Sequence, residues 1–119
     1  MITLVDTSVW IDHLRRSNEQ LVKLLDEGRV CCHELVVGEL ACDTLRNRDE
    51  LLALLKALPE VRMAKHNEVL TFVVKRQLSG RGLGWVDMHL LASALLANCK
   101  IWSLDKALAA AATQLKLGS

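Results

Sequence analysis

Four acidic side chains stand at positions from which they could act on one substrate: Asp6, Glu39, Asp87 and Asp105. Carboxylates that meet within a few Å raise one another's pKa, and a bound cation is the economical way to keep them ionised. Carboxylate oxygens without cysteine or histidine suit Mg²⁺ or Mn²⁺ better than zinc. Such an ion, or a pair of ions, could activate water and stabilise the charge that builds on a phosphodiester. The acids therefore predict metal-dependent nuclease chemistry if the fold brings them together.

Each acid also has an ordinary explanation. An aspartate in the first turn of a helix is favoured by capping and by the helix dipole, which would account for Asp87 alone. The other acids could be turn, capping or surface charges. Their joint position is what favours a metal site over four separate roles.

The apolar pattern predicts two strands that end at acids. Residues 1–5 are a short apolar run typical of a buried strand, and a helix capped by Thr7 or Ser8 follows, so that Asp6 lies at the carboxyl end of the strand. Residues 100–104 predict a strand and a turn, with Asp105 just beyond. In open α/β sheets this edge is where ligands bind.

Two predicted helices carry the other acids. Residues 86–97 are apolar almost all the way round, which indicates a central helix buried on most of its surface, with Asp87 in its first turn. Residues 34–43 predict a helix in which Glu39 lies on an apolar face. We expect this glutamate to be buried, which is costly unless it is paired, hydrogen-bonded or bound to a cation.

The rest of the chain continues the alternation. Helices are predicted over 18–28, 49–58, 67–78 and 106–115, short strands over 29–32 and 61–64, and a flexible loop over 79–84. Strands alternating with helices in so short a chain imply a parallel sheet with helices on both faces. Parallel pairing places the carboxyl ends of the first and last strands on one edge, and a helix entered from that edge would start there too.

Composition limits the class of protein. A chain of 119 residues, 51% hydrophobic and 24% charged, predicts one domain over residues 1–119 that buries its own core. No apolar run is long enough for a membrane span and no signal-peptide pattern is present, so we expect a cytoplasmic protein. The net charge is only +1, and nucleic acid would therefore have to bind a local patch.

The four cysteines predict free buried thiols. Cys31, Cys32, Cys42 and Cys99 show no C-x-x-C spacing and no framework of paired cysteines. A zinc site that combined the first two with His33 is disfavoured, because neighbouring residues on a strand point to opposite faces.

Four segments resemble the acidic motifs of the PIN-domain ribonucleases, in order and at the expected intervals. They are residues 5–11, 37–40, 85–94 and 101–105, and together they span nearly the whole chain. Within that family the chain is most similar to the VapC-type toxins of bacterial toxin-antitoxin pairs. The resemblance implies a three-layer α/β/α sandwich with a central parallel sheet, and a Mg²⁺- or Mn²⁺-dependent endoribonuclease that hydrolyses structured RNA. It also implies a homodimer, and a VapB-like antitoxin that wraps the toxin and reaches its acidic groove.

The same resemblance assigns roles to single residues. Asp6, Glu39 and Asp87 would be metal-binding catalytic acids, and Asp105 a fourth that completes the cluster directly or through water. Ser103 stands where the family often has threonine, so a hydroxyl that can orient a carboxylate, water or substrate is kept. No motif acid is missing, as expected of an active member.

Hydroxyl and basic side chains are further candidates. Thr7 or Ser8 could hydrogen-bond into the site, although helix capping explains either equally well. Arg81 is the favoured phosphate contact because its loop lies near the site. A solvated surface is the default for it and for the other basic candidates, which are Arg15, Arg16, Arg46, Arg48 and Lys106.

Aromatic side chains more often have structural roles. We expect Trp10, Trp85 and Trp102 in the core or in a dimer contact, and Trp85 is the best candidate for stacking on RNA because it adjoins Asp87 and a glycine loop. Structural, hydrogen-bonded roles are likewise favoured over proton transfer for the two histidines near the acids, His13 and His89.

Three other functions fit the pattern less well. A purely binding protein, whose acidic groove docks a basic peptide, would need no metal, whereas a nuclease would. A phosphoacceptor module needs paired acids early and an aspartate after a middle strand, but Asp6 is followed by Thr7 and Glu39 falls in a helix. A phosphatase with Asp6 as nucleophile expects a second acid two residues later, where this chain has Ser8.

Overall fold

Three short parallel strands form the centre of the molecule, which a computed structural model describes over residues 1–119. They are β1 (Thr3–Val5), β2 (Val30–Cys31) and β3 (Lys100–Trp102), in the order β2-β1-β3. Because β1 lies in the middle, it pairs in parallel with both neighbours. The carboxyl ends of all three strands therefore face the same edge of the sheet, as the sequence predicts.

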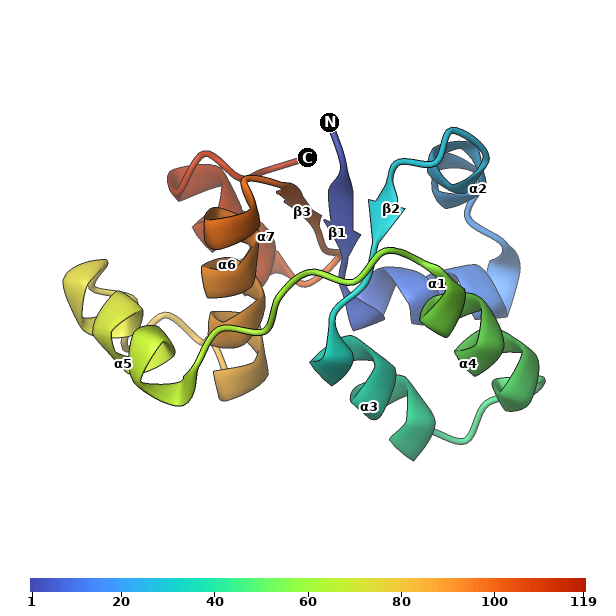
Figure 1. The fold of residues 1–119 in the computed structure, drawn as a ribbon, viewed down its shortest axis with the longest axis horizontal. Coiled ribbons are helices and arrows are strands. Elements are labelled where there is room, and N and C mark those ends of the chain that lie inside the picture. The colour runs from blue at the N-terminus through green and yellow to red at the C-terminus, as the bar shows by residue number, and fades with distance from the viewer.

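Seven helices surround this sheet (Figure 1). In the view of Figure 1, α1 to α4 gather on the side of β2, whereas α6 and α7 lie beside β3 and α5 packs on the outside of α6. This arrangement confirms the predicted α/β sandwich. The helices are α1 (Thr7–Arg16), α2 (Glu19–Asp26), α3 (Glu34–Cys42), α4 (Arg48–Ala57), α5 (His66–Lys75), α6 (Trp85–Ala97) and α7 (Lys106–Gln114).

The central helix is α6. Every residue from Met88 to Ala94 is buried, because the sheet, α5 and neighbouring segments cover the helix on successive sides. The apolar side chains of this stretch belong to one cluster of 27 buried hydrophobic residues, whereas His89 and Ser93 are buried polar residues. The prediction of a helix buried on most of its surface is confirmed, and its first turn is left at the carboxyl edge of the sheet. No helix has the length and the hydropathy that crossing a membrane requires.

The strand predicted over 61–64 does not form. The chain instead makes an isolated bridge between Glu60 and Cys32, in which Cys32 donates to the Pro59 carbonyl at 2.8 Å and accepts from Val61 N at 2.9 Å. Pairing stops there because β2 is only two residues long and the chain beyond Cys32 turns into α3. The expectation of four buried thiols is also wrong for Cys42, which is exposed in the last turn of α3, while the other three are buried and all four are free.

Gly38 lies within a helix at a position where neither the backbone conformation nor a close neighbour requires glycine. It lies within α3, and a Cβ added there would meet nothing within 4 Å. Because glycine costs a helix interior about 1 kcal/mol relative to alanine, we expect Gly38→Ala to raise the free energy of unfolding by about that amount. Urea unfolding would measure the change. Gly118→Ala is the matched control that should destabilise, because its Cβ would lie 2.9 Å from Thr113 Oγ1. A loss of stability in Gly38→Ala would contradict this interpretation.

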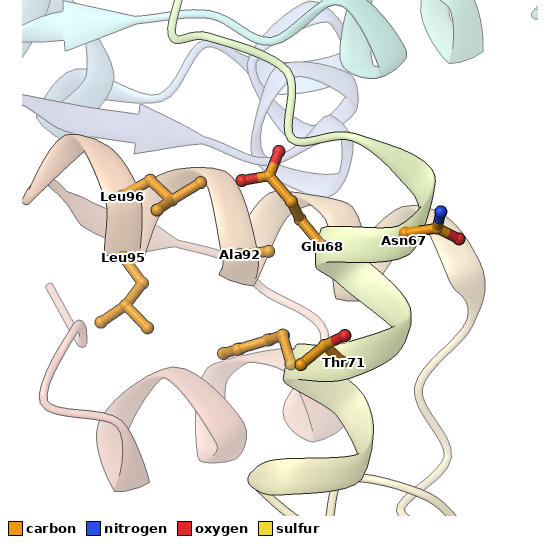
Figure 2. Close-up of a pocket in the computed structure, with 7 residues that line it drawn as sticks. Asn67, Glu68, Thr71, Ala92, Leu95 and Leu96 are labelled. Carbon is orange, nitrogen blue, oxygen red and sulfur yellow. The ribbon is translucent and has the colours of Figure 1, made fainter.

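An apolar cavity lies between α5 and α6, away from the acids. Figure 2 shows the side chains of both helices that line it. Its volume is about 430 Å³, and none of the four candidate acids is among its lining residues. The outer surface of α5 is apolar as well, with Leu70 45% and Val74 75% exposed. The lining residues are Asn67, Glu68, Thr71, Phe72, Ala92, Leu95 and Leu96.

Candidate active site

The ends of β1 and β3 bring Asp6 and Ser103 together. Asp6 N donates to the carbonyl of Trp102 at 3.0 Å, so the sheet pairing continues through the first residue after β1. Both side chains are buried, with 6% of Asp6 and 9% of Ser103 exposed. A buried carboxylate needs donors, and the structure supplies them from hydroxyl groups rather than from a basic residue.

Two serine hydroxyls hold one oxygen of Asp6. Ser8 Oγ donates to Asp6 Oδ2 at 2.8 Å, and Ser103 Oγ donates to the same atom at 2.7 Å. Each hydroxyl in turn accepts a backbone N–H, Ser8 from Leu104 and Ser103 from Asp105, both at 3.0 Å. The backbone donors direct the hydroxyl protons toward the carboxylate, and Asp6 Oδ1 has no hydrogen-bond donor.

Neither Thr7 nor Ser8 caps α1, contrary to one sequence-based alternative. The helix begins at Thr7 with Asp6 at the N-cap position, and no side chain makes a capping bond. Thr7 Oγ1 instead donates to Glu39 Oε1 at 2.7 Å. Both hydroxyls at the start of α1 therefore orient candidate metal ligands, which is the other role that the sequence allowed.

Glu39 is exposed, so the expectation of a buried glutamate is wrong. The buried residues of α3 are Val36 and Leu40, on the side of the helix that faces the core. Leu35 and Cys42, on another side of the helix, border an open groove of about 500 Å³, so this apolar side is not covered by the fold. This groove is lined by Leu35, Gly38, Glu39, Cys42 and Val86.

Asp87 lies half-buried in the first turn of α6, as predicted. Its Oδ2 accepts from Gly84 N at 3.0 Å, so the side chain also closes the start of the helix. Burial raises the pKa of this carboxyl, and the nearby charges of Asp6, Asp105 and Glu39 raise it further, while the bond from Gly84 opposes the shift. The charges of the other three predicted acids thus all act on Asp87.

Asp105 sits just after β3, at the N-cap position of α7. It is exposed, and its carboxylate makes no hydrogen bond within the chain. Its backbone N–H, which donates to Ser103 Oγ, ties it to the hydroxyl that holds Asp6. The acid therefore stands at the rim of the site with both oxygens free.

The donor set fits a divalent cation. The ion pairs of the chain involve Asp12, Glu27 and Glu68, so none of the four candidate acids has a basic partner. Each keeps at least one carboxylate oxygen without a hydrogen bond, and oxygen is the ligand that Mg²⁺ and Mn²⁺ prefer. As they stand, no three of these side chains converge on one point closely enough to hold an ion. Like charges hold such carboxylates apart, and a cation would draw them together.

Arg81 is turned toward α7. Its guanidinium donates to the side chain of Gln114, at the end of that helix, and it pairs with no acidic residue. The loop over 79–84 that carries it is exposed and leads directly into α6. Arg81 is therefore near the start of the helix that bears Asp87, but its hydrogen-bond partner lies at the end of α7 opposite Asp105.

The two histidines near the acids differ in their surroundings, and only His13 makes a hydrogen bond of the kind that the sequence favours. His13 Nδ1 accepts from Asn18 N at 3.0 Å, where α1 turns into α2. His89 is buried, and burial first, then the charge of His66, lowers its pKa. Its Nδ1 has no hydrogen-bond partner, and its ring packs edge-on against Trp85.

His33 is a positioning residue that the sequence analysis did not find. Its Nδ1 accepts from Leu35 N at 3.0 Å and caps α3, and its Nε2 pairs with Ser93 Oγ of α6 at 3.0 Å. Burial lowers its pKa to about 4, so the ring is neutral at pH 7. His33 thus joins the helix of Glu39 to the helix of Asp87. The sequence did contain a signal for this role, because His33 stands directly between a predicted strand and a predicted helix, where a side chain can cap the helix.

Comparison with known proteins defines the class. A model of the PIN domain matches residues 3–114, so this chain belongs to the PIN-domain family. Among characterised relatives, the chain is similar to Ribonuclease VapC32 of Mycobacterium tuberculosis, in strains CDC 1551 / Oshkosh and ATCC 25618 / H37Rv. In both strains the identity is 47% over 112 residues, which cover 93% of this chain and 90% of the relative.

Proposed function

We propose that this protein is an endoribonuclease that hydrolyses RNA phosphodiester bonds and acts as the toxin of a toxin-antitoxin pair. The observation that carries the proposal is the group of four acids at the carboxyl edge of the sheet, none of which has a basic partner. The similarity of this chain to Ribonuclease VapC32 supports RNA as the substrate. The family's acidic motifs occur in order along the chain.

Mg²⁺ or Mn²⁺ is the proposed cofactor, held by Asp6, Glu39, Asp87 and Asp105. When bound, such an ion supplies an activated water and stabilises charge on the phosphodiester. The chain's own contribution is orientation: hydroxyl groups fix one oxygen of Asp6 and one of Glu39, and a backbone N–H fixes one of Asp87. The unbonded oxygens are left free to bind the cation.

The proposal extends to partners and location. RNA phosphates would be held by local contacts, with Arg81 and Ser103 as proposed substrate-binding residues. A VapB-like antitoxin would cover the acidic groove, and the protein, a single domain over residues 1–119, would act in the cytoplasm. The alternative is a silent binding module whose acidic groove docks a basic peptide. Dependence on metal distinguishes the two functions, because a basic peptide can bind carboxylates without a metal ion, whereas the proposed nuclease requires one.

The direct test is incubation of the purified protein, free of antitoxin, with total bacterial RNA in the presence of Mg²⁺, Mn²⁺ or EDTA. We expect discrete fragments with either ion and intact RNA with EDTA. A folded protein that binds a basic peptide equally well with and without metal, and leaves RNA intact in all three reactions, would instead support the docking module.

Ser103 offers a finer test of how the site is held. We expect Ser103→Ala to lower both Mn²⁺ affinity and the cleavage rate by about 10- to 100-fold, because one of the two hydroxyl bonds to Asp6 is lost. Ser103→Thr should restore both, since it keeps the hydroxyl. Calorimetric titration with Mn²⁺ gives the affinity without relying on activity. Equal values for the alanine variant and the parent would remove Ser103 from the site.

A homodimer is also part of the proposal, and the exposed apolar surface of α5 is the face we assign to it. Sedimentation of the parent should give twice the chain mass of 13.2 kDa. Leu70→Glu combined with Val74→Glu should give the chain mass, because each charge would be buried without a partner in the contact. Val22→Glu, at a valine 38% exposed on α2, is the matched control. A dimer that survives the double substitution would place the contact elsewhere.

A further inference from the structure

Trp85 is the most exposed of the three tryptophans. Its side chain is 40% exposed, whereas Trp10 is fully buried and Trp102 is partly buried. It is the first residue of α6, two residues before Asp87, so the two side chains leave the same turn of the helix on different sides. A large aromatic surface is therefore left open to solvent at the same end of α6 as a proposed catalytic acid.

Two histidines hold the indole ring in place. The ring of His66, at the start of α5, lies with its centroid 5.0 Å from that of Trp85 at an interplanar angle of 49°. The buried His89 lies at 5.0 Å and 89°, in an edge-to-face contact. A ring packed on two sides keeps its orientation before a ligand arrives, so binding costs it little conformational entropy.

The charges around the site favour an uncharged contact to RNA. The four acids repel phosphates, and the net charge of +1 gives the whole chain little attraction for a polyanion. Stacking of a base on an aromatic ring does not depend on the protein's charge. The base must be unpaired, because a base within an A-form helix already has its faces covered by its neighbours.

We propose that the open surface of Trp85 stacks on an unpaired base of the RNA, at the same end of α6 as the acids that cut the phosphodiester. This inference rests on the proposed ribonuclease function. It adds that the nucleotide at the site is single-stranded or looped out, and it gives Trp85 a role in substrate specificity that the acidic motifs do not supply.

The test uses Asp87→Asn protein, so that the RNA stays intact while binding is measured. A short single-stranded RNA of mixed sequence should quench the tryptophan fluorescence, and the same sequence annealed into a duplex should quench it less. Adding Trp85→Leu should abolish the quenching and weaken the dissociation constant for the single strand by about 5- to 150-fold. Trp85→Phe should retain most of the affinity, because a phenyl ring still stacks.

A second arm uses the protein with Trp85 unchanged. An abasic nucleotide moved along the RNA should weaken binding strongly at one position, and that position should lie within a few nucleotides of the cleavage site. Uniform effects along the strand, or Trp85→Leu protein that binds as tightly as its Trp85 counterpart, would overturn stacking. Dissociation of a dimer by Trp85→Leu with unchanged RNA affinity would assign the ring to a contact between copies instead, and would also overturn stacking.

These outcomes are separable from the failure of the proposed function. If Trp85→Leu cleaves RNA at the parent's rate while Asp87→Asn is inactive, stacking is wrong and the ribonuclease assignment stands. If Asp87→Asn still cleaves, the assignment of the acids is wrong whatever Trp85 does.

Discussion

Replacing Asp87 by asparagine should abolish RNA cleavage while leaving the fold intact. The substitution removes one negative charge from the four that are proposed to bind the cation, but asparagine can still accept the hydrogen bond from Gly84 N. Because a bound metal contributes several kcal/mol of transition-state stabilisation, we expect a loss of at least about 10³-fold in rate. Asp6→Asn should have an effect of the same size.

The control for this prediction is Asp26→Asn, which changes an exposed acid at the end of α2. It alters the net charge by the same amount and should cleave as the parent does. The cleavage rates of the parent, Asp87→Asn and Asp26→Asn proteins would be measured on one defined RNA, and circular dichroism would verify that each protein is folded. Unchanged cleavage by Asp87→Asn would remove that acid from the mechanism.

In the absence of metal, Asp87→Asn protein should be at least as stable as the parent. Burial and the neighbouring acids raise the pKa of Asp87 above its usual 3.8, so the folded state binds this proton more tightly than the unfolded state does. The free energy of unfolding of the parent therefore falls as pH rises from the unfolded pKa through the folded one. Asp87→Asn lacks this decline. Urea unfolding in EDTA, across that pH range and at pH 7, would check it, and a large loss at pH 7 would favour a structural role.

Adding Mn²⁺ should raise the melting temperature of the metal-free protein. A ligand at about 100 times its dissociation constant stabilises the folded state by about 2.7 kcal/mol, which for a chain of this size corresponds to roughly 10 °C. The shift arises because the four carboxylates repel one another until a cation is bound. Differential scanning calorimetry after treatment with EDTA would measure it.

Variants of the acids test whether the ion that raises the melting temperature binds at the proposed site. Asp6→Asn and Asp87→Asn should each show a much smaller shift with Mn²⁺, and Asp26→Asn should show the shift of the parent. Equal shifts in all four proteins would mean that the ion binds outside the cluster, and no shift in any of them would favour the docking module over a metal-dependent enzyme.

The parts of the fold that the sequence predicts are those with a local signal. The apolar run before Asp6 and the helix around Asp87 are confirmed, because a buried strand and a helix covered on most of its surface both appear directly as runs of apolar residues. The shared edge of β1 and β3 follows from the parallel topology. These elements are enough to place three of the four acids near one another.

Features that depend on contacts distant in sequence could not be predicted in this way. Glu39 is exposed because one apolar side of α3 borders an open groove, and residue spacing does not distinguish a covered side from an open one. Nor does it distinguish a hydroxyl that caps a helix from one that holds a carboxylate, as Thr7 does for Glu39. The strand predicted over 61–64 failed because its partner, β2, is too short to extend the ladder.

The central claim, that these acids cleave RNA with water activated by a divalent cation, is tested most directly by the chemistry of the cut ends. Attack by water leaves the ribose 2′-hydroxyl unused, so the protein should produce ends without a 2′,3′-cyclic phosphate and should cut an RNA that carries a single 2′-deoxynucleotide at the cleavage position. Both results should require Mg²⁺ or Mn²⁺ and an intact Asp87. Cyclic phosphate ends formed by the purified protein in EDTA, or equally well by Asp87→Asn, would contradict it.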